Sequence, residues 1–213
     1  DVQLREVGGE ILSFTCIDDD YHDWQNEHRK AALFLCDRVI RADVDTAPGK
    51  KMKIFSFGKD NNYKTSQVRA WLQKNSQNSS FCLEPIHTGI QTAYMGSTAA
   101  GAFSQTSGRE LVRHDIGFQL MNDQLFCLSL EEALAYREYL WRFDSGDDNP
   151  QSQVSAYSQG YYLRTPFYLQ DENGKFIYNQ QIYGVDLVNG CLRPVRTDSE
   201  TYGVRPAFAL SQM

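Results

Sequence analysis

Apolar and polar residues alternate along much of the chain, and this pattern predicts a protein built mainly from short strands. Residues 10–17 alternate with the period of a half-buried strand. Residues 31–40 form a more continuous apolar run, which is typical of a more fully buried strand. The last third of the chain returns to strand-like runs at residues 160–164, 176–188, 191–195 and 202–210.

Two segments show the period of a helix instead. Residues 66–74 place Val68, Trp71 and Leu72 on one face, at spacings of three and four. Residues 129–141 begin with a serine that is followed three positions later by a glutamate. These two side chains can each bond the other residue's backbone amide, which is a capping box and indicates a helix start.

Long polar stretches separate these elements. Residues 75–108 are rich in Ser, Asn, Thr and Gly, and residues 144–160 are acidic and polar. Loops of this length are uncommon in compact domains unless they bind something or are disordered. Because no segment has the composition of a linker, we predict one loop-rich α+β domain over residues 1–213.

The net charge excludes some partners. The chain has 21 Lys and Arg against 27 Asp and Glu, a formal charge of −6. Without a concentrated basic patch we expect no nucleic-acid binding and no attraction to an anionic membrane. The longest apolar runs, residues 31–35 and 125–130, are far shorter than a bilayer span, so we expect no membrane insertion.

The cysteines indicate buried thiols rather than a disulfide framework. The chain has five, an odd number, and none forms a CxxC pair. Cys16, Cys36 and Cys127 each have apolar neighbours, which suits small buried hydrophobic residues.

Catalytic motifs are absent, and we therefore predict a protein that is not an enzyme. Residues 96–101 have the glycine spacing of a phosphate loop but lack its lysine and hydroxyl residue. No nucleophile elbow occurs either. Of three oxygen-rich stretches, residues 144–149 form the best candidate calcium site, and we expect no other cofactor. Asp147 and Asp148 in that stretch are candidate ligand-binding residues.

Tyrosines are concentrated between residues 157 and 183. Exposed tyrosines make rigid, amphipathic contacts, so Tyr157, Tyr161 and Tyr168 are further candidate ligand-binding residues. The alternation of a strand would equally place some of them in the core, and this alternative stays open.

Four sequence blocks occur in order along the chain. They are SQVRAWL at residues 66–72, LFCLSLEEA at 125–133, YLRTP at 162–166 and GVRPA at 203–207. Together they resemble a bacterial family of unknown function that is similar to the C-type-lectin-like fold of the formylglycine-generating type. This chain departs from the family pattern at Tyr162, where Trp is commoner, and at Gln73, where Asn is usual.

The resemblance implies small twisted antiparallel sheets with two flanking helices, adjacent termini and long loops on one side. It also implies structural roles for four residues. Arg164 and Arg205 are expected to bond backbone carbonyls or carboxylates within the fold. Trp71 and Phe208 are expected to lie in the core.

A non-catalytic ligand-binding module, on a bacterial surface or secreted, is the function that these observations favour. It would recognise a glycan or a protein through loops 75–108, 144–160 and 192–201, with tyrosines stacking on sugar rings. The alternatives are a thiol- or metal-dependent enzyme on the same scaffold and a structural or assembly domain of a larger surface protein. The buried cysteines favour a cytoplasmic location as the alternative to the cell surface.

Overall fold

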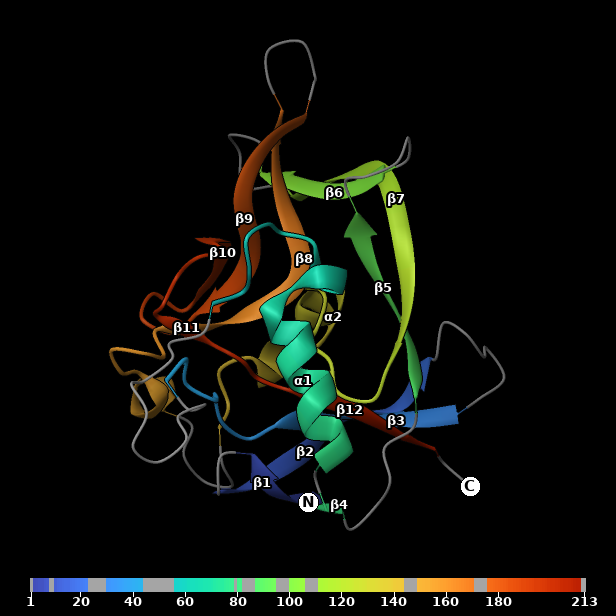
Figure 1. Ribbon diagram of the computed structural model, residues 1–213, viewed down its shortest axis with the longest axis vertical. Helices are drawn as coiled ribbons and strands as arrows, with labels where there is room; N and C mark the ends of the chain where they lie inside the picture. The colour runs from blue at the N-terminus through green and yellow to red at the C-terminus, as the bar shows by residue number, and fades with distance from the viewer. Residues whose placement is uncertain are drawn as a thin grey trace.

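The computed structural model (Figure 1) has a mixed α+β architecture, made mostly of strands in three curled sheets with two α-helices. It describes residues 2–7, 10–22, 30–43, 56–78, 80–81, 87–94, 100–105, 111–143, 149–170 and 176–211. The α+β class predicted from the sequence is therefore confirmed.

The first sheet has five antiparallel strands and lies at the bottom of Figure 1. Its order is β12 (Ala207–Ser211), β3 (Lys30–Cys36), β2 (Glu10–His22), β1 (Val2–Val7) and β4 (Ser80–Phe81). It holds the first and the last strand of the chain. The buried rings of Phe14 and Phe208 meet across it at 4.8 Å between centroids, so Phe208 is a core residue.

The second sheet carries most of the last third of the chain. Its order is β10 (Cys191–Arg196), β9 (Phe176–Asp186), β8 (Gly160–Gln170) and β11 (Tyr202–Gly203). The β8–β9–β10 meander is antiparallel, whereas β11 runs parallel to β8. The segment between β10 and β11 therefore crosses from one edge of the sheet to the other.

A third sheet corrects the expectation of a long loop over residues 75–108. Its strands are β5 (Thr88–Tyr94), β7 (Leu111–Asp123) and β6 (Ala100–Gln105). β5 and β6 consist largely of small and polar residues, so they lack the apolar run that marks a strand in the sequence. They form strands because each pairs with β7 along its whole length.

Both predicted helices are present. α1 (Gln67–Asn78) runs four residues beyond the predicted end. α2 (Leu130–Ala135) has the predicted capping box between Ser129 and Glu132 but is shorter than predicted. The chain continues as a 3₁₀ turn, η2 (Arg137–Tyr139). Two further 3₁₀ turns are η1 (Tyr63–Thr65) and η3 (Pro150–Gln153).

Trp71 and Leu72 on α1 are buried, as the helical pattern predicts. Arg69, on the same helix, makes two hydrogen bonds of 2.8 and 2.7 Å to the buried carboxylate of Asp123 at the end of β7. This pair ties the third sheet to α1. None of the helices described in the structure is long and apolar enough to cross a membrane.

The prediction of buried thiols holds for Cys36 and Cys127 but is wrong for Cys16, which is exposed. The register of β2 against β3 shifts between Cys16 and Asp18. Leu12 and Phe14 point inward before this irregularity, and Ile17 points inward after it. Cys16 still pairs with Phe34 in the regular register, so the alternation of buried residues breaks at Cys16, just before the irregularity, and a simple alternation rule misses the change.

Candidate functional site

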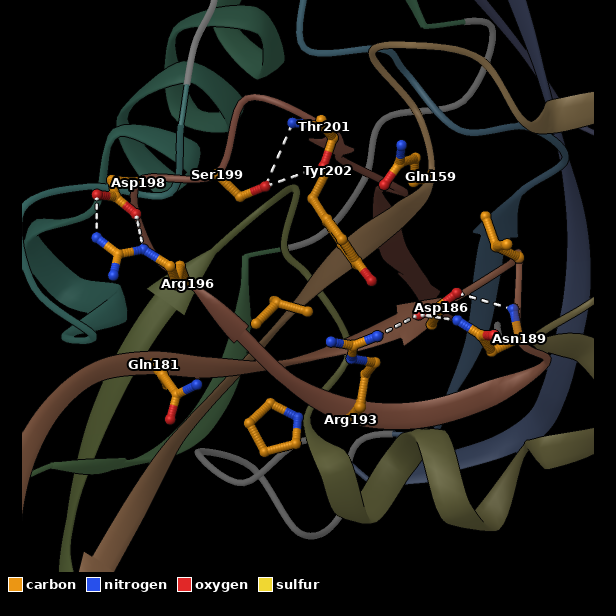
Figure 2. A pocket seen from close by; sticks show the side chains of 13 residues that line it. Gln159, Gln181, Asp186, Asn189, Arg193, Arg196, Asp198, Ser199, Thr201 and Tyr202 are labelled. Atoms are coloured by element: carbon orange, nitrogen blue, oxygen red, sulfur yellow. Dashed lines mark hydrogen bonds and ion pairs between the residues drawn. The ribbon is translucent and has the colours of Figure 1, made fainter.

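A groove of about 680 Å³ opens on the second sheet (Figure 2). The β9–β10 hairpin forms one side, and the segment from Arg196 to Tyr202 forms the other. Gln159, just before β8, completes the lining. The groove thus gathers residues from both edges of the sheet.

Tyr202 lies in the middle of the groove between its two walls (Figure 2). Its ring packs on Gly160 and Gly184, two glycines of neighbouring strands. The absence of a side chain at both positions makes room for the ring, since a Cβ on Gly160 would lie 2.6 Å from the Tyr202 Cε1 atom and a Cβ on Gly184 would lie 3.2 Å from it. Only 6% of Tyr202 is exposed. Burial raises the pKa of its phenol, and the nearby Asp186 carboxylate raises it further. Tyr202 therefore stays protonated at neutral pH.

Asp186 anchors the first wall. Its side chain is 4% exposed and accepts hydrogen bonds from the Asn189 amide nitrogen, the Asn189 Nδ2 and Arg193 Nη1, at 2.9, 2.9 and 3.0 Å. Burial alone would raise the pKa of this carboxyl, but the bonds from Asn189 and Arg193 lower it below its ordinary value. Asp186 is thus an anion that orients Arg193, whose own side chain is 52% exposed in the groove.

Arg196 and Asp198 form the second wall. Arg196 donates from Nε and Nη2 to the two carboxylate oxygens of Asp198, at 2.8 and 2.6 Å. These bonds lower the pKa of Asp198. Both side chains are well exposed.

Buried contacts fix the turn that carries this wall. Thr197 is buried, and its backbone donates to Gln180 at 3.0 Å and accepts from Gly58 at 3.1 Å. The Tyr162 hydroxyl donates to the Ser199 carbonyl at 2.7 Å. The wall is therefore held in place before any ligand arrives.

The lining mixes polar residues with the apolar Val188, Pro194 and Val195, and its charges balance. Its two cations, Arg193 and Arg196, face two anions, Asp186 and Asp198. Most of the other lining residues carry amides and hydroxyls, which can donate and accept hydrogen bonds. Such a site can bind a neutral ligand that has many hydrogen-bonding groups.

Arg164, for which a structural role was predicted, lies away from this groove. It donates to both oxygens of Glu132 at 2.6 and 2.8 Å, and to the Cys127 carbonyl at 2.6 Å. The Tyr21 hydroxyl and the Ser129 amide also donate to Glu132. These contacts join β2, α2 and β8 inside the fold.

Arg205 is buried and makes the backbone contacts expected of it. Its guanidinium donates to the carbonyls of Cys36, Tyr139, Leu140 and Arg142 at 2.6–3.1 Å. It also lies 4.4 Å from the centroid of the Phe143 ring. Because Arg205 binds the carbonyls that follow α2, it holds the chain in a turn where the sequence predicts more helix.

The tyrosine predictions have mixed outcomes. Tyr161 was expected to contact a ligand, and this is wrong: it is 1% exposed, and its hydroxyl donates to the Leu140 carbonyl at 2.9 Å. The side chain of Tyr161 lies on the face of β8 that packs against the core. Tyr157 is half-buried against the core and does not line the groove. The side chain of Tyr168, and Asp147 and Asp148, lie outside the described residues.

Two of the predicted binding segments do reach the groove. The segment 192–201 supplies much of its lining, although residues 192–196 are a strand rather than a loop. The segment 144–160 contributes Gln159. Asp186, Asn189 and Tyr202 were not among the candidate residues predicted from the sequence. The Asn189-Gly190 pair is a hairpin-turn signal that would have placed Asn189, and Gly190 has the positive φ, 62°, of such a turn.

The described part of the chain contains no group of three or more His, Cys, Asp and Glu side chains arranged to hold a metal. Burial raises the pKa of the Cys36 thiol to about 11 and that of Cys127 to about 12. These two thiols are therefore poor nucleophiles near neutral pH.

The described part of the chain thus has a mixed α+β architecture, with a groove on one sheet that many polar and charged side chains line. Residues 33–212 match the family described as a domain of unknown function (DUF6273), and the chain belongs to this family. No curated protein and no solved structure matches the chain significantly.

Proposed function

We propose that this protein is a non-catalytic module that binds a glycan in the groove between the β9–β10 hairpin and the 196–202 segment. The observation that carries the proposal is the charge-balanced set of hydrogen-bonding side chains around a fixed groove. Sugar hydroxyls both donate and accept, so they match a lining of guanidinium, carboxylate and amide groups. A pocket that is formed beforehand also loses little entropy on binding.

Hydrogen bonding, rather than aromatic stacking, is the mode of recognition that the groove favours. Among the described residues that line it, Tyr202 alone has an aromatic ring, and this ring packs on Gly160 and Gly184. Arg193 and the amides of Gln159 and Gln181 are the groups that a ligand would meet. We therefore assign binding to these planar side chains rather than to Tyr157.

The C-type-lectin-like fold is part of the same proposal. Two helices beside small antiparallel sheets, and first and last strands in one sheet, support it. We also propose display on the cell surface or secretion, with the cytoplasm as the alternative. Calcium at residues 144–149 is a separate proposal, and the groove does not depend on it.

A glycan array, probed with and without calcium chelator, tests the proposal. We expect saturable binding to one sugar class that persists in chelator. Calorimetry with the best glycan should show at least tenfold weaker binding by Arg193→Met, because this change removes the central donors of the groove. Arg137→Met, on the exposed turn η2, is the matched control and should bind as the parent does.

Failure to bind any glycan would overturn the proposal and favour a protein partner. Equal losses in the two arginine variants would show that the groove is not the site. Binding that is lost in chelator would move the site to the 144–149 segment.

A further inference from the structure

We infer that Asp198 selects neutral saccharides over acidic ones at the groove. This inference rests on the proposed glycan-binding function and names the class of glycan. Its basis is the two-point bond between Arg196 and Asp198 at the rim.

The Arg196 guanidinium is the group at this rim that an acidic sugar would seek. A guanidinium binds a carboxylate best through two parallel N–H donors. Asp198 already occupies two donors of Arg196, Nε and Nη2, in that geometry. The carboxylate of a ligand would have to displace Asp198 and then lie beside its negative charge.

The other cation of the groove is occupied in a similar way. Arg193 donates to Asp186, which two nitrogens of Asn189 also hold in place. Asp186 is buried, so it cannot turn away to make room for a second anion. A neutral hydroxyl, in contrast, needs only one of the remaining donors and meets no repulsion.

Repulsion of unwanted ligands is a common source of specificity, because a ligand whose charge lies beside a like charge binds less tightly. Asp198 is the element that can be altered without harm to the fold, since its side chain is 60% exposed. Asp186 is not suitable for such a test because it is buried and fixes the β9–β10 turn.

The test compares the parent protein with Asp198→Asn on an array of neutral glycans and of uronic- or sialic-acid glycans. We expect the parent to prefer neutral glycans. Asp198→Asn should bind the acidic glycans at least about tenfold more tightly than the parent does, with a stronger dependence on salt.

Glu200→Gln is the matched control. It removes the same charge from the same turn, but Glu200 does not line the groove and leaves the Arg196–Asp198 bond intact. An equal gain in this variant would show a general charge effect and would overturn the role of Asp198. Circular dichroism of each variant verifies the fold.

The outcomes separate this inference from the proposed function. A parent protein that prefers acidic glycans would overturn the inference and leave glycan binding in place. An Asp198→Asn variant that keeps the selectivity of the parent for neutral glycans would also overturn the inference and leave glycan binding in place. No glycan binding by the parent or by either variant would overturn both.

Discussion

Two arginine–carboxylate pairs in this protein have similar geometry and different surroundings. Arg164 and Glu132 approach to 2.6 Å, with 2% and 12% of their side chains exposed. Arg196 and Asp198 approach to 2.6 Å as well, with 69% and 60% exposed. Each arginine makes a two-point bond to its partner.

Burial, rather than geometry, assigns the two pairs to different tasks. The removal of one partner from a buried pair leaves an uncompensated charge in the core. An exposed pair is screened by water and salt, so it contributes little to stability, and either partner can be exchanged. We therefore regard Arg164–Glu132 as part of the fold and Arg196–Asp198 as part of the groove.

The largest expected effect is the loss of Arg164. Arg164→Met should lower the free energy of unfolding by about 3–5 kcal/mol, because Glu132 then stays buried without its cation. Urea unfolding followed by circular dichroism measures the change. Arg196→Met is the matched control and should leave the urea midpoint unchanged. Equal losses of stability in the two variants would refute the distinction between the pairs.

The second arginine of the core tests whether the shape of the cation matters. Arg205→Lys keeps the charge but offers three donors to four backbone carbonyls that surround the guanidinium. We expect a loss of at least about 2 kcal/mol, because each buried carbonyl left without a donor costs about 1–3 kcal/mol. Thermal unfolding measures it. A variant that melts like the parent would show that one ammonium serves this site equally well.

A smaller effect is expected at Gly160, on which the ring of Tyr202 packs. In Gly160→Ala the new Cβ would lie 2.1 Å from the Val185 carbonyl oxygen and 2.6 Å from the Tyr202 ring. We expect a loss of about 1–3 kcal/mol and weaker glycan binding, since both the Val185 backbone and the Tyr202 ring must shift. Gly190→Asn is the control, because nothing lies within 4 Å of a Cβ there and Asn tolerates a positive φ. Calorimetry measures the glycan affinity of each variant, and urea unfolding measures its stability. Equal results for Gly160→Ala and Gly190→Asn would contradict this account.

The parts of the fold that sequence could predict depend on short-range interactions. The capping box at Ser129 and the apolar face of 66–74 involve residues only three or four positions apart. The end of α2 could not be predicted in this way, because Arg205, more than sixty residues away, binds the carbonyls beyond it. β5 and β6 were likewise missed because their partner strand, rather than their composition, makes them strands.

The groove was harder to predict because it depends on the topology of the sheet. The segment 192–201 was identified as a binding segment from the sequence, and it does line the groove. Tyr202 reaches the groove only because β11 crosses to pair with β8 in parallel. The burial of Asp186, which makes it an anchor rather than a solvated turn residue, also follows from strand pairing. No local sequence pattern predicts the position of Tyr202 or the burial of Asp186.

Acid unfolding gives the smallest expected effect and the finest test of the comparison. Burial alone would raise the pKa of Glu132, but Arg164 and the other donors lower it below its ordinary value of about 4.3. A lowered pKa in the folded state stabilises the protein above about pH 4.3, and this contribution is lost as the pH falls through the folded pKa. The melting temperature of the parent should therefore decrease as the pH is lowered below about 5.

The melting temperature of Glu132→Gln should decrease less steeply over the same pH range, whatever the absolute stability of this variant. Asp198→Asn should keep the slope of the parent because its pair is exposed and screened. The reverse result, with the slope lost in Asp198→Asn, would mean that the exposed pair supports the fold.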